Sequence, residues 1–406
     1  MRNRNIISSI DIGTSRICAI IAEINRDNLL EIIGIGVSPS MGIKKGAIID
    51  IDSTTKSIIN AVEKAEQMAD STIDSAFINY TGGNISLVKN KGIVAVRSEN
   101  KEISEEDTER VMQTARVVAV PTDKEIIDVI PLEFIVDGYS GIKDPIGMVG
   151  TRLEVDAQII MGSKTSVRGL VSSVQNSKVT PKGIIINPLA ASKVLLTEDE
   201  KDLGVALIDI GGGTSEISIF LGGNLIFTKT LPIGGNHITN DIAIGLRIPL
   251  SLAEKVKNRY GCALVSSSDS SLEFDFQRIG DQQKLRTNQQ YLAEIIEPRV
   301  LEILELTKKE LNNHGFSTLL PVGAVITGGG LHSLKGFYEA SNQILEMPVR
   351  MGIPGYFGME EPFYSVAVGV LEYVHKNKQY KQRLANRTNE ITNIFMMIRK
   401  WVKDYF

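Results

Sequence analysis

Residues 207–220 read LIDIGGGTSEISIF. An apolar run in this stretch ends at Asp209, three glycines follow, and a run that alternates apolar and polar residues comes after Thr214. Glycine loses more conformational freedom on folding than any other residue, so three of them in one tight turn indicate that a ligand lies against the backbone. A weaker copy, SSIDIGTSRICAII at residues 8–21, places Asp11 and a glycine before the same kind of turn. The sequence therefore predicts two equivalent strand–turn–strand units.

Length and composition indicate a globular chain with more than one core. The chain has 406 residues and is 43% hydrophobic, and single cores stop growing near roughly 250–300 residues. Its two cysteines, Cys18 and Cys262, are far apart in sequence and are expected to be buried free thiols of a reducing compartment. Ser8, Ser9 and Asp11 interrupt the first apolar run, which argues against a signal peptide. No window offers the ~20 apolar residues of a membrane span, so we expect a cytosolic chain.

Charge is distributed unevenly along the chain. The net charge is −4, but residues 376–406 contain eight Lys or Arg and only two acidic residues. This segment therefore carries +6 and the rest of the chain −10 at neutral pH. A basic tail on an acidic body predicts that the tail has an anionic partner of its own.

Apolar patterns predict an α/β chain with a duplicated core. Strands are expected at residues 8–13, 17–24 and 30–37, before a helix that has Asp52 or Ser53 as its N-cap and ends near residue 69. Residues 203–231 repeat the three strands, and helices are expected at about 234–246, 250–261 and 284–314. Two similar halves would then face each other across a cleft.

Residues 85–161 interrupt this order after the breaker TGGN at 81–84. Two short strands, a helix with a capping box at Ser104, and strands near 125–136 and 151–161 predict a small inserted domain. The remaining elements are expected as a strand at 74–80, a helix at 163–177, a strand at 182–187, a short helix opened by Pro188, a strand at 322–327, a helix ending near 346 and a last helix at 362–375.

The paired glycine turns favour phosphate binding. Successive backbone N–H groups without side chains form a concave nest that attracts phosphate oxygens. Asp11 and Asp209, with phosphate oxygens and water, would supply the oxygen ligands that Mg²⁺ prefers, mostly through water. Thr14, Ser15, Arg16 and Thr214 add donors at the same positions. The alternative is a pair of glycine hairpins without a ligand, but two such turns, each preceded by an aspartate, favour the binding site.

A third glycine cluster, Gly328, Gly329 and Gly330, lies between an apolar strand and a helix. Glycines at such a junction let a base or ribose lie against the backbone, although they also serve helix packing. We interpret Gly34 and Gly36 as a strand end without a site. No GxxxxGK[ST] motif occurs, so the predicted phosphate site is of another type.

Three motifs carry a resemblance to a known superfamily. IDIGTSR (10–16), LIDIGGGTSEI (207–217) and VITGGGLHSLKGF (325–337) resemble the phosphate-1, phosphate-2 and adenosine motifs of the actin/Hsp70/sugar-kinase superfamily. Further segments, among them GIKKGAIIDIDS (42–53), IGGNHITNDIA (233–243) and PFYSVAVGVLEY (362–373), are similar to FtsA, a family of bacterial actin-like cell-division proteins. The likeness extends over nearly the whole chain.

The resemblance implies an actin-like two-lobed fold of duplicated ribonuclease-H-like domains, with an inserted 1C subdomain and a C-terminal amphipathic helix. Its subdomains would be 1A at 1–84 and 162–198, 1C at 85–161, 2A at 199–232 and 318–375, and 2B at 233–317, before a linker at 376–389 and the helix at 390–406. Ala190, Ala191, Ala367 and Gly369 are small, as a close helix contact between the lobes would need.

The resemblance also implies the ATP contacts. The phosphates would meet Gly13, Thr14, Ser15, Arg16, Gly211, Gly212, Gly213, Thr214, Gly234 and Gly235, and adenine and ribose would lie near Glu254, Lys257, Gly328, Gly329 and Gly330. Hsp70-like relatives carry Glu where this chain has Asn187, and a neutral amide cannot act as a base. We therefore expect ATP and Mg²⁺ binding with weak hydrolysis at most, and we assign no catalytic residue.

The C-terminal sequence NEITNIFMMIRKWVKDYF (389–406) predicts an amphipathic helix. Its apolar stripe consists of Ile391, Ile394, Phe395, Ile398, Trp401, Val402 and Tyr405, with the basic residues Arg399, Lys400 and Lys403 beside or opposite it. A terminal helix docked on the body would explain the stripe alone. The polar linker and the basic face favour an interfacial membrane anchor, as the family's targeting helix also implies.

The leading hypothesis is an ATP-binding adaptor that polymerises and tethers FtsZ filaments to the cytoplasmic face of the cell membrane at the division septum. The resemblance implies that the C-terminal tail of FtsZ docks on the lobe at 233–317, with Arg286 and Arg299 as candidate contacts, and that later cell-division proteins bind as well. We expect no nucleic-acid partner. The alternatives are a sugar or acetate kinase-like phosphotransferase, an Hsp70-like ATPase and a pilus-assembly relative.

Overall fold

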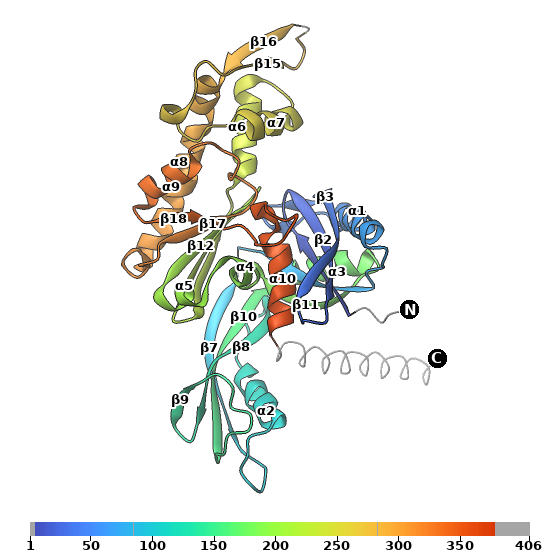
Figure 1. The fold of residues 1–406 in the computed structure, drawn as a ribbon, viewed down its shortest axis with the longest axis vertical. Coiled ribbons are helices and arrows are strands. Elements are labelled where there is room, and N and C mark those ends of the chain that lie inside the picture. Colours follow the sequence, from blue (N-terminus) through green and yellow to red (C-terminus); the bar gives the residue numbers. More distant parts are fainter. Residues whose placement is uncertain (1–4, 84, 282, 378–406) are drawn as a thin grey trace.

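The computed structural model describes residues 5–83, 85–281 and 283–377. Two sheets with their helices form the middle of an elongated molecule, as Figure 1 shows. A small domain projects from one end of this body and a mainly helical region from the other. The fold is the actin-like two-lobed α/β fold with an inserted domain that the sequence predicts.

The sheet of the first lobe has five strands. Their spatial order is β11 (Thr180–Ile186), β6 (Ser75–Tyr80), β1 (Ile6–Ile12), β2 (Arg16–Ile24) and β3 (Leu30–Pro39). The β1–β2–β3 meander is antiparallel, whereas β6 runs parallel to β1. Two short strands, β4 (Ile43–Lys44) and β5 (Ala47–Ile48), form a separate hairpin.

The sheet of the second lobe repeats this topology. Its order is β14 (Asn224–Leu231), β13 (Ser215–Leu221), β12 (Val205–Ile210), β17 (Ala324–Thr327) and β18 (Val349–Met351). Again three consecutive strands form an antiparallel meander, and a later strand, β17, pairs in parallel with the first of them. The duplication predicted from the two glycine turns is therefore confirmed.

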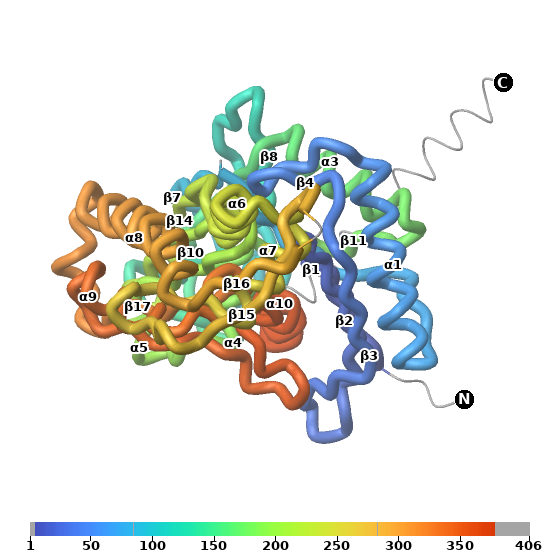
Figure 2. The backbone as a smooth tube through the Cα atoms, turned by 90° about the horizontal axis from the view of Figure 1, so that it is seen from above, coloured from blue at the N-terminus to red at the C-terminus, as the bar shows by residue number. Residues whose placement is uncertain are grey.

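Helices lie beside and between the lobes. They are α1 (Ile51–Ala69), α3 (Lys164–Asn176), α4 (Asn187–Leu195), α5 (Glu198–Leu203) and α10 (Ser365–Lys376), the last preceded by the 3-10 turn η3 (Pro362–Tyr364). Figure 2 shows α4 and α10 between the two lobes. The prediction of Asp52 or Ser53 as the cap of α1 is wrong, because the Asp50 carboxylate accepts from the Ser53 N–H at 3.1 Å and the helix begins at Ile51.

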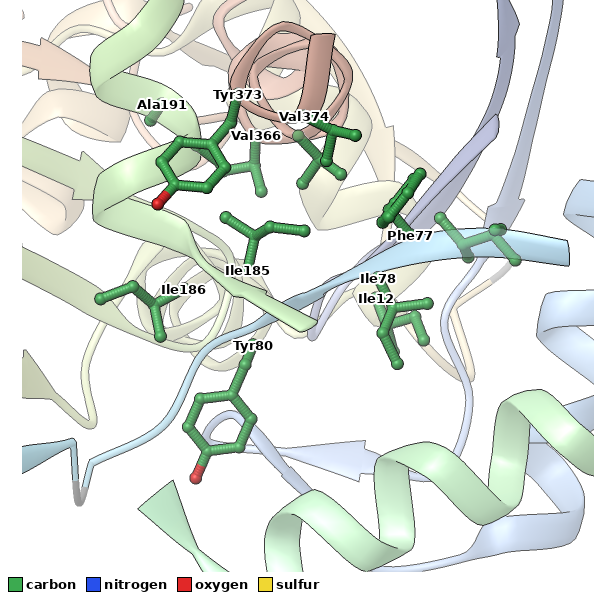
Figure 3. Close-up of a cluster of buried hydrophobic side chains, with 14 of the residues drawn as sticks. Ile12, Phe77, Ile78, Tyr80, Ile185, Ile186, Ala191, Val366, Tyr373 and Val374 are labelled. Carbon is green, nitrogen blue, oxygen red and sulfur yellow. The ribbon is translucent and has the colours of Figure 1, made fainter. Parts of the chain in front are cut away.

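The contact between α4 and α10 depends on small residues. A Cβ added to Gly369 on α10 would lie 2.2 Å from the Ala190 carbonyl oxygen on α4, and Ala190 and Ala367 are fully buried. The predicted close approach of these helices is confirmed. In Figure 3, Val366, Tyr373 and Val374 on α10 and Ala191 on α4 lie beside Ile185 on β11. One apolar core therefore joins α4 and α10 to the first sheet, and it extends to Leu207 and Val325 of the second.

The inserted domain is a four-stranded sheet covered by one helix. The elements are β7 (Ser86–Ala95), α2 (Glu105–Arg116), β8 (Lys124–Val136), β9 (Tyr139–Ile142) and β10 (Arg152–Ser163), with the strand order β7-β10-β8-β9. The capping box at Ser104 is confirmed, with Asp107 as its partner. Residues 86–95 form one long strand and not two short ones, because β7 pairs with β10 without a break.

The remaining elements belong to the region at the opposite end or, like the helix α9 (Phe337–Leu345) beside β18, to the second lobe. Besides α9, they are α6 (Gly235–Leu246), α7 (Leu250–Tyr260), η1 (Val265–Ser267), β15 (Glu273–Gln277), β16 (Lys284–Asn288), α8 (Gln289–Asn313) and η2 (Phe316–Thr318). Residues 284–288 were expected to be helical, but they pair with β15 as a strand. The Asn288 side chain accepts from the Tyr291 N–H at 2.9 Å and caps α8, so the helix starts five residues later than predicted.

Both cysteines are buried free thiols, as predicted. Within residues 5–83, 85–281 and 283–377, no helix is both long and apolar enough to span a bilayer. The predicted amphipathic helix at 390–406 and most of its linker lie outside the described residues.

Candidate functional site

The two glycine turns have the same backbone geometry. The Gly13 N–H donates to the Arg16 carbonyl at 3.1 Å, and the Gly211 N–H donates to the Thr214 carbonyl at 2.9 Å. Each turn begins two residues after its aspartate, Asp11 or Asp209. Duplication therefore produced two equivalent hairpins that both end at the cleft between the lobes.

The turns face each other at contact distance. A Cβ built on Gly212 would lie 1.8 Å from Ser15 Oγ, and one built on Gly213 would lie 2.5 Å from Thr14 Cγ2. The Ser15 hydroxyl donates to Asn236 Oδ1 at 3.0 Å and so links the first turn to α6. Any side chain at position 212 would collide with the opposite turn, which explains why glycine is needed there.

The amides at the tips of the turns are available to a ligand. Among the described residues, the backbone N–H groups of Thr14, Ser15, Gly212 and Gly213 make no recorded intramolecular hydrogen bond. Buried or partly buried backbone N–H groups are almost always paired with protein, water or ligand. Thr14, Ser15 and Gly212 line the cleft, and their three donors fit an anion with several oxygens, such as a phosphate chain.

These turns border a cleft of about 880 Å³. The predicted site residues that line it are Asp11, Gly13, Thr14, Ser15, Arg16, Asp209, Gly211, Gly212, Thr214, Glu254, Lys257, Gly328, Gly329 and Gly330. The three motifs, far apart in sequence, thus meet at one cavity.

Three predicted contacts, Gly213, Gly234 and Gly235, are not among the lining residues. The Gly235 N–H donates to the Gly211 carbonyl at 3.0 Å, and a Cβ on Gly235 would lie 2.5 Å from the Gly330 carbonyl oxygen. The Gly330 N–H in turn donates to the Ile210 carbonyl at 2.8 Å. Gly235 therefore holds the second turn and the third glycine cluster together from behind.

One end of the cleft carries an ion pair between buried Lys257 and partly exposed Glu254. Lys257 Nζ lies 2.8 Å from a Glu254 carboxylate oxygen and donates to Thr239 Oγ1 at 3.0 Å, and Thr239 also contacts Glu254. Burial lowers the pKa of Lys257, while the Glu254 charge opposes this shift. Both side chains lie on α7 and are fixed by each other. They form a rigid polar wall where the base and ribose are expected.

An aromatic ring lies near this wall. The Arg16 guanidinium stacks over the Phe363 ring at 4.9 Å from its centroid, and Phe363 comes from η3, before α10. Gly329 leaves space for the same ring, since its Cβ would lie 3.0 Å from Phe363 Cβ. The stack fixes the Arg16 side chain at the cleft.

The carboxylates form the other end. Burial and then the Asp209 charge raise the pKa of Asp11 to about 8, and burial raises the pKa of Asp209 to about 6. Asn187 is buried, and its Oδ1 accepts from Asn79 Nδ2 at 3.0 Å. Asn79 Oδ1 accepts in turn from the Ile12 N–H at 2.7 Å, so Asn187 is fixed to β1.

Asp11 and Asp209 fit a hydrated divalent cation. Both line the cleft, and neither forms an ion pair with a basic side chain among the described residues. In the same part of the chain, no group of three or more His, Cys, Asp or Glu is placed to hold a metal directly. A cation at this position would therefore be held through water and ligand oxygens, as Mg²⁺ often is.

Several lining residues were not predicted as contacts. They are Thr81, Asn187, Glu216, Asn236, Pro362, Phe363 and Val366. Of these, Glu216 had a detectable signal. It lies seven residues after Asp209 across a tight hairpin, so antiparallel pairing places the two residues opposite each other. Phe363 and Thr81 come from distant segments and carry no local pattern.

The two predicted partner residues lie away from the cleft and are engaged in ion pairs. Arg286 on β16 contacts Asp275 at 3.0 Å and Glu273 at 3.3 Å. Arg299 on α8 contacts Asp241 at 2.7 Å and also pairs with Glu302. An acidic ligand would have to compete with these carboxylates.

Comparison with known proteins gives the family. Residues 206–369 match the family described as "Cell division protein FtsA", and residues 82–161 match "SHS2 domain inserted in FTSA". Solved structures with the same fold include the PilM–PilN type IV pilus biogenesis complex, with a TM-score of 0.63, 16% identity, and coverage of 91% of this chain and 98% of that one. Another is MreB5 of Spiroplasma citri bound to ADP, with a TM-score of 0.55, 14% identity, and coverage of 96% and 100%.

Sequence relatives are much closer. The cell division protein FtsA of Bacillus subtilis is 43% identical over 94% of this chain and 86% of its own length. The cell division protein FtsA of Pseudomonas aeruginosa is 38% identical over 92% of this chain and 90% of its own length. That of Borreliella burgdorferi is 35% identical over all of both chains. Identity at this level over more than nine tenths of the sequence shows that the chain belongs to the FtsA family of cell-division proteins.

Proposed function

We propose that this protein is an ATP-binding, actin-like adaptor that polymerises and tethers FtsZ filaments to the cytoplasmic membrane during division. The observation that carries the nucleotide part is the pair of facing turns, in which the amides of Thr14, Ser15 and Gly212 have no partner among the described residues and share one cleft with the carboxylates of Asp11 and Asp209. Membership of a cell-division family supports the cellular role and disfavours the sugar kinase, Hsp70-like and pilus-assembly alternatives.

In this proposal different residues of the cleft bind the phosphates, the nucleoside and the cation. The amides of Thr14, Ser15, Gly212 and Gly213 hold phosphate oxygens, and the N-terminus of α6 adds a favourable dipole next to the second turn. The Lys257–Glu254 pair and the glycines at 328–330 form the walls of the nucleoside site. Mg²⁺ supplies neutralising charge for the phosphates, and Asp11 and Asp209 hold its water.

Hydrolysis is proposed to be slow. A general base must accept a proton, and the neutral amide side chain of Asn187 cannot do so. Its amide oxygen is already used by Asn79. The cleft is therefore better suited to binding ATP than to cleaving it.

The remaining parts of the proposal come from the sequence. The apolar stripe from Ile391 to Tyr405 enters the lipid headgroup region, and Arg399, Lys400 and Lys403 meet anionic lipid at roughly 1 kcal/mol each. The FtsZ tail docks near Arg286 and Arg299, and further copies of the chain and later division proteins bind other surfaces. The site of action would be the cytoplasmic face at the septum.

Vesicle co-sedimentation tests this function. The full chain should sediment with anionic vesicles, and it should carry an FtsZ tail peptide with it, whereas a truncated chain of residues 1–388 should do neither. Trp401→Glu removes apolar area worth several kcal/mol at ~25 cal/mol per Å², so it should also abolish sedimentation. Trp401 is the only tryptophan, so its emission should shift to the blue with lipid. Sedimentation of Trp401→Glu equal to that of the unmodified chain would refute the membrane role.

A further inference from the structure

Glu216 is a third carboxylate of the cleft. The β12–β13 register places it directly opposite Asp209, so the two side chains lie on the same face of the hairpin. Directly opposed residues of antiparallel strands have Cβ atoms roughly 4.5–5.5 Å apart, and like charges there repel. In the first lobe the equivalent pair is Asp11 and Cys18, with no second acid. The acidic pair is thus specific to the second lobe.

The Glu216 side chain is held on one side only. It is 4% exposed, and its Oε1 accepts from the Thr228 hydroxyl at 3.3 Å. Thr228 Oγ1 lies 3.1 Å from Ser218 Oγ, which fixes the threonine. The other carboxylate oxygen, Oε2, is buried and has no hydrogen-bond partner among the described residues. A buried polar atom without a partner is rare and calls for water, an ion or a ligand.

The basic groups of the cleft are engaged elsewhere. Arg16 lies over the Phe363 ring, and Lys257 pairs with Glu254. No ion pair is recorded for Glu216, Asp209 or Asp11 in the described part of the chain. Burial, followed by the Asp209 charge, raises the pKa of Glu216 to about 8. Three carboxyl groups, of which Glu216 is buried and Asp11 and Asp209 are partly buried, therefore line one cleft without an ion pair to Arg16 or Lys257, and clustered charges of one sign need a counter-ion or a proton.

We propose that Glu216 is a positioning residue of the cation site, which holds through its free oxygen a water molecule of the divalent cation bound with the nucleotide. The proposal rests on the proposed function, since Asp11 and Asp209 hold the same hydrated ion. Thr228 and Ser218 orient the carboxylate from behind. Such outer contacts typically change metal affinity 10–100-fold when they are removed.

The experiment separates metal binding from nucleotide binding. ATP affinity is measured by titration calorimetry with Mg²⁺ and with EDTA, and Mn²⁺ bound in the ATP complex is counted by electron paramagnetic resonance. Glu216→Gln should leave the ATP affinity measured in EDTA within about twofold of that of the unmodified chain. It should reduce the increase in ATP affinity that Mg²⁺ causes (the Mg²⁺ gain) at least tenfold. Thr228→Val keeps the charge and removes only the orienting hydroxyl, so it should reduce the gain by a smaller factor.

Glu372→Gln is the matched control. Glu372 on α10 is also a buried carboxylate, but it pairs with Lys376 at 2.8 Å and does not line the cleft. Its replacement should leave the Mg²⁺ gain unchanged. A full Mg²⁺ gain in both Glu216→Gln and Thr228→Val, with normal ATP binding, would overturn the inference and leave the proposed nucleotide site intact. Absence of ATP binding by the unmodified chain, with or without Mg²⁺, would instead overturn the proposed nucleotide site and this inference together.

Discussion

The two glycine turns share a backbone but contribute different things to the cleft. The turn of the first lobe carries side chains, the hydroxyls of Thr14 and Ser15, and these occupy the space that Gly212 and Gly213 leave open in the second. A symmetric duplication has thus become a complementary pair. Gly212 and Gly213 of the second lobe accommodate the side chains of the first, and Gly212 also presents to the cleft an N–H that is unpaired among the described residues.

Replacing Gly212 should have the largest effect on this pair. Gly212→Val places a Cβ 1.8 Å from Ser15 Oγ and covers the amides of the turn. In the unmodified protein, ATP·Mg²⁺ at 100 times its Kd should stabilise the fold by about 2.7 kcal/mol, and the variant should show no such gain. Differential scanning fluorimetry checks this. Gly355→Val is the control, because nothing lies within 4 Å of a Cβ there. A full ATP-induced rise in Tm for Gly212→Val would contradict the paired site.

A double substitution tests whether the two turns are complementary. Gly212→Ala should weaken ATP binding by the same collision, and Ser15→Gly should relieve it, since both close atoms of residue 15 are removed. The coupling between the two changes should be about 1–3 kcal/mol, with the double variant binding ATP better than Gly212→Ala alone. Calorimetry on all four proteins completes the cycle. Additive losses would mean that the turns do not depend on each other.

The last position of each turn also differs, with Arg16 in the first lobe and Thr214 in the second. Arg16→Lys keeps the charge but loses the flat stack on Phe363, so ATP affinity should fall by roughly 0.5–1 kcal/mol. Arg259→Lys removes a similar stack, on Tyr260 at 5.2 Å, outside the cleft and serves as the control. Equal ATP affinities for Arg16→Lys and the unmodified chain would show that the stack does not serve binding.

The two turns also differ in their threonines, and this difference concerns stability and not ATP affinity. Thr14 Oγ1 accepts from the Gly46 N–H at 3.2 Å, whereas no side-chain hydrogen bond is recorded for Thr214 among the described residues. Thr14→Ala should therefore lower the free energy of unfolding by roughly 0.5–1.5 kcal/mol, and Thr214→Ala by less. Urea unfolding of the two variants gives the comparison. A larger loss for Thr214→Ala would reverse the assignment of roles to the turns.

Local patterns predicted the duplicated strands and both turns, because alternating polarity and glycine placement act within a few residues. They failed at 284–288, where the chain has no glycine break and only pairing with β15 and the Asn288 cap decide between strand and helix. The short strands β9 and β18 were missed for a related reason, whereas α5 has a local signal in the capping box of Thr197 and Glu200. Tertiary contacts, and not propensity, stabilise strands of so few residues.

The residues of the candidate nucleotide site also separate into those that local patterns predict and those that only the tertiary structure brings together. The motifs identified Asp11, Asp209 and the glycines at 211–213 because chemistry and spacing coincide there. Glu216 needed the hairpin register, and Phe363 needed the position of η3 relative to the first lobe. Arg286 pairs with Asp275 on the neighbouring strand, and Arg299 pairs with Asp241, 58 residues earlier, so these two contacts needed the tertiary structure, whereas the pair of Arg299 with Glu302 is local to α8.

The end of α10 at Lys376 sets a length scale for the proposed attachment to lipid. The predicted membrane helix begins at residue 390, which leaves the segment 377–389 between the two. Even a fully extended chain of this length spans only about 45 Å, at roughly 3.3–3.6 Å per residue. Attachment through this tether would therefore limit the height of the protein body above the bilayer without prescribing its tilt, so filaments of different curvature could remain anchored to one membrane.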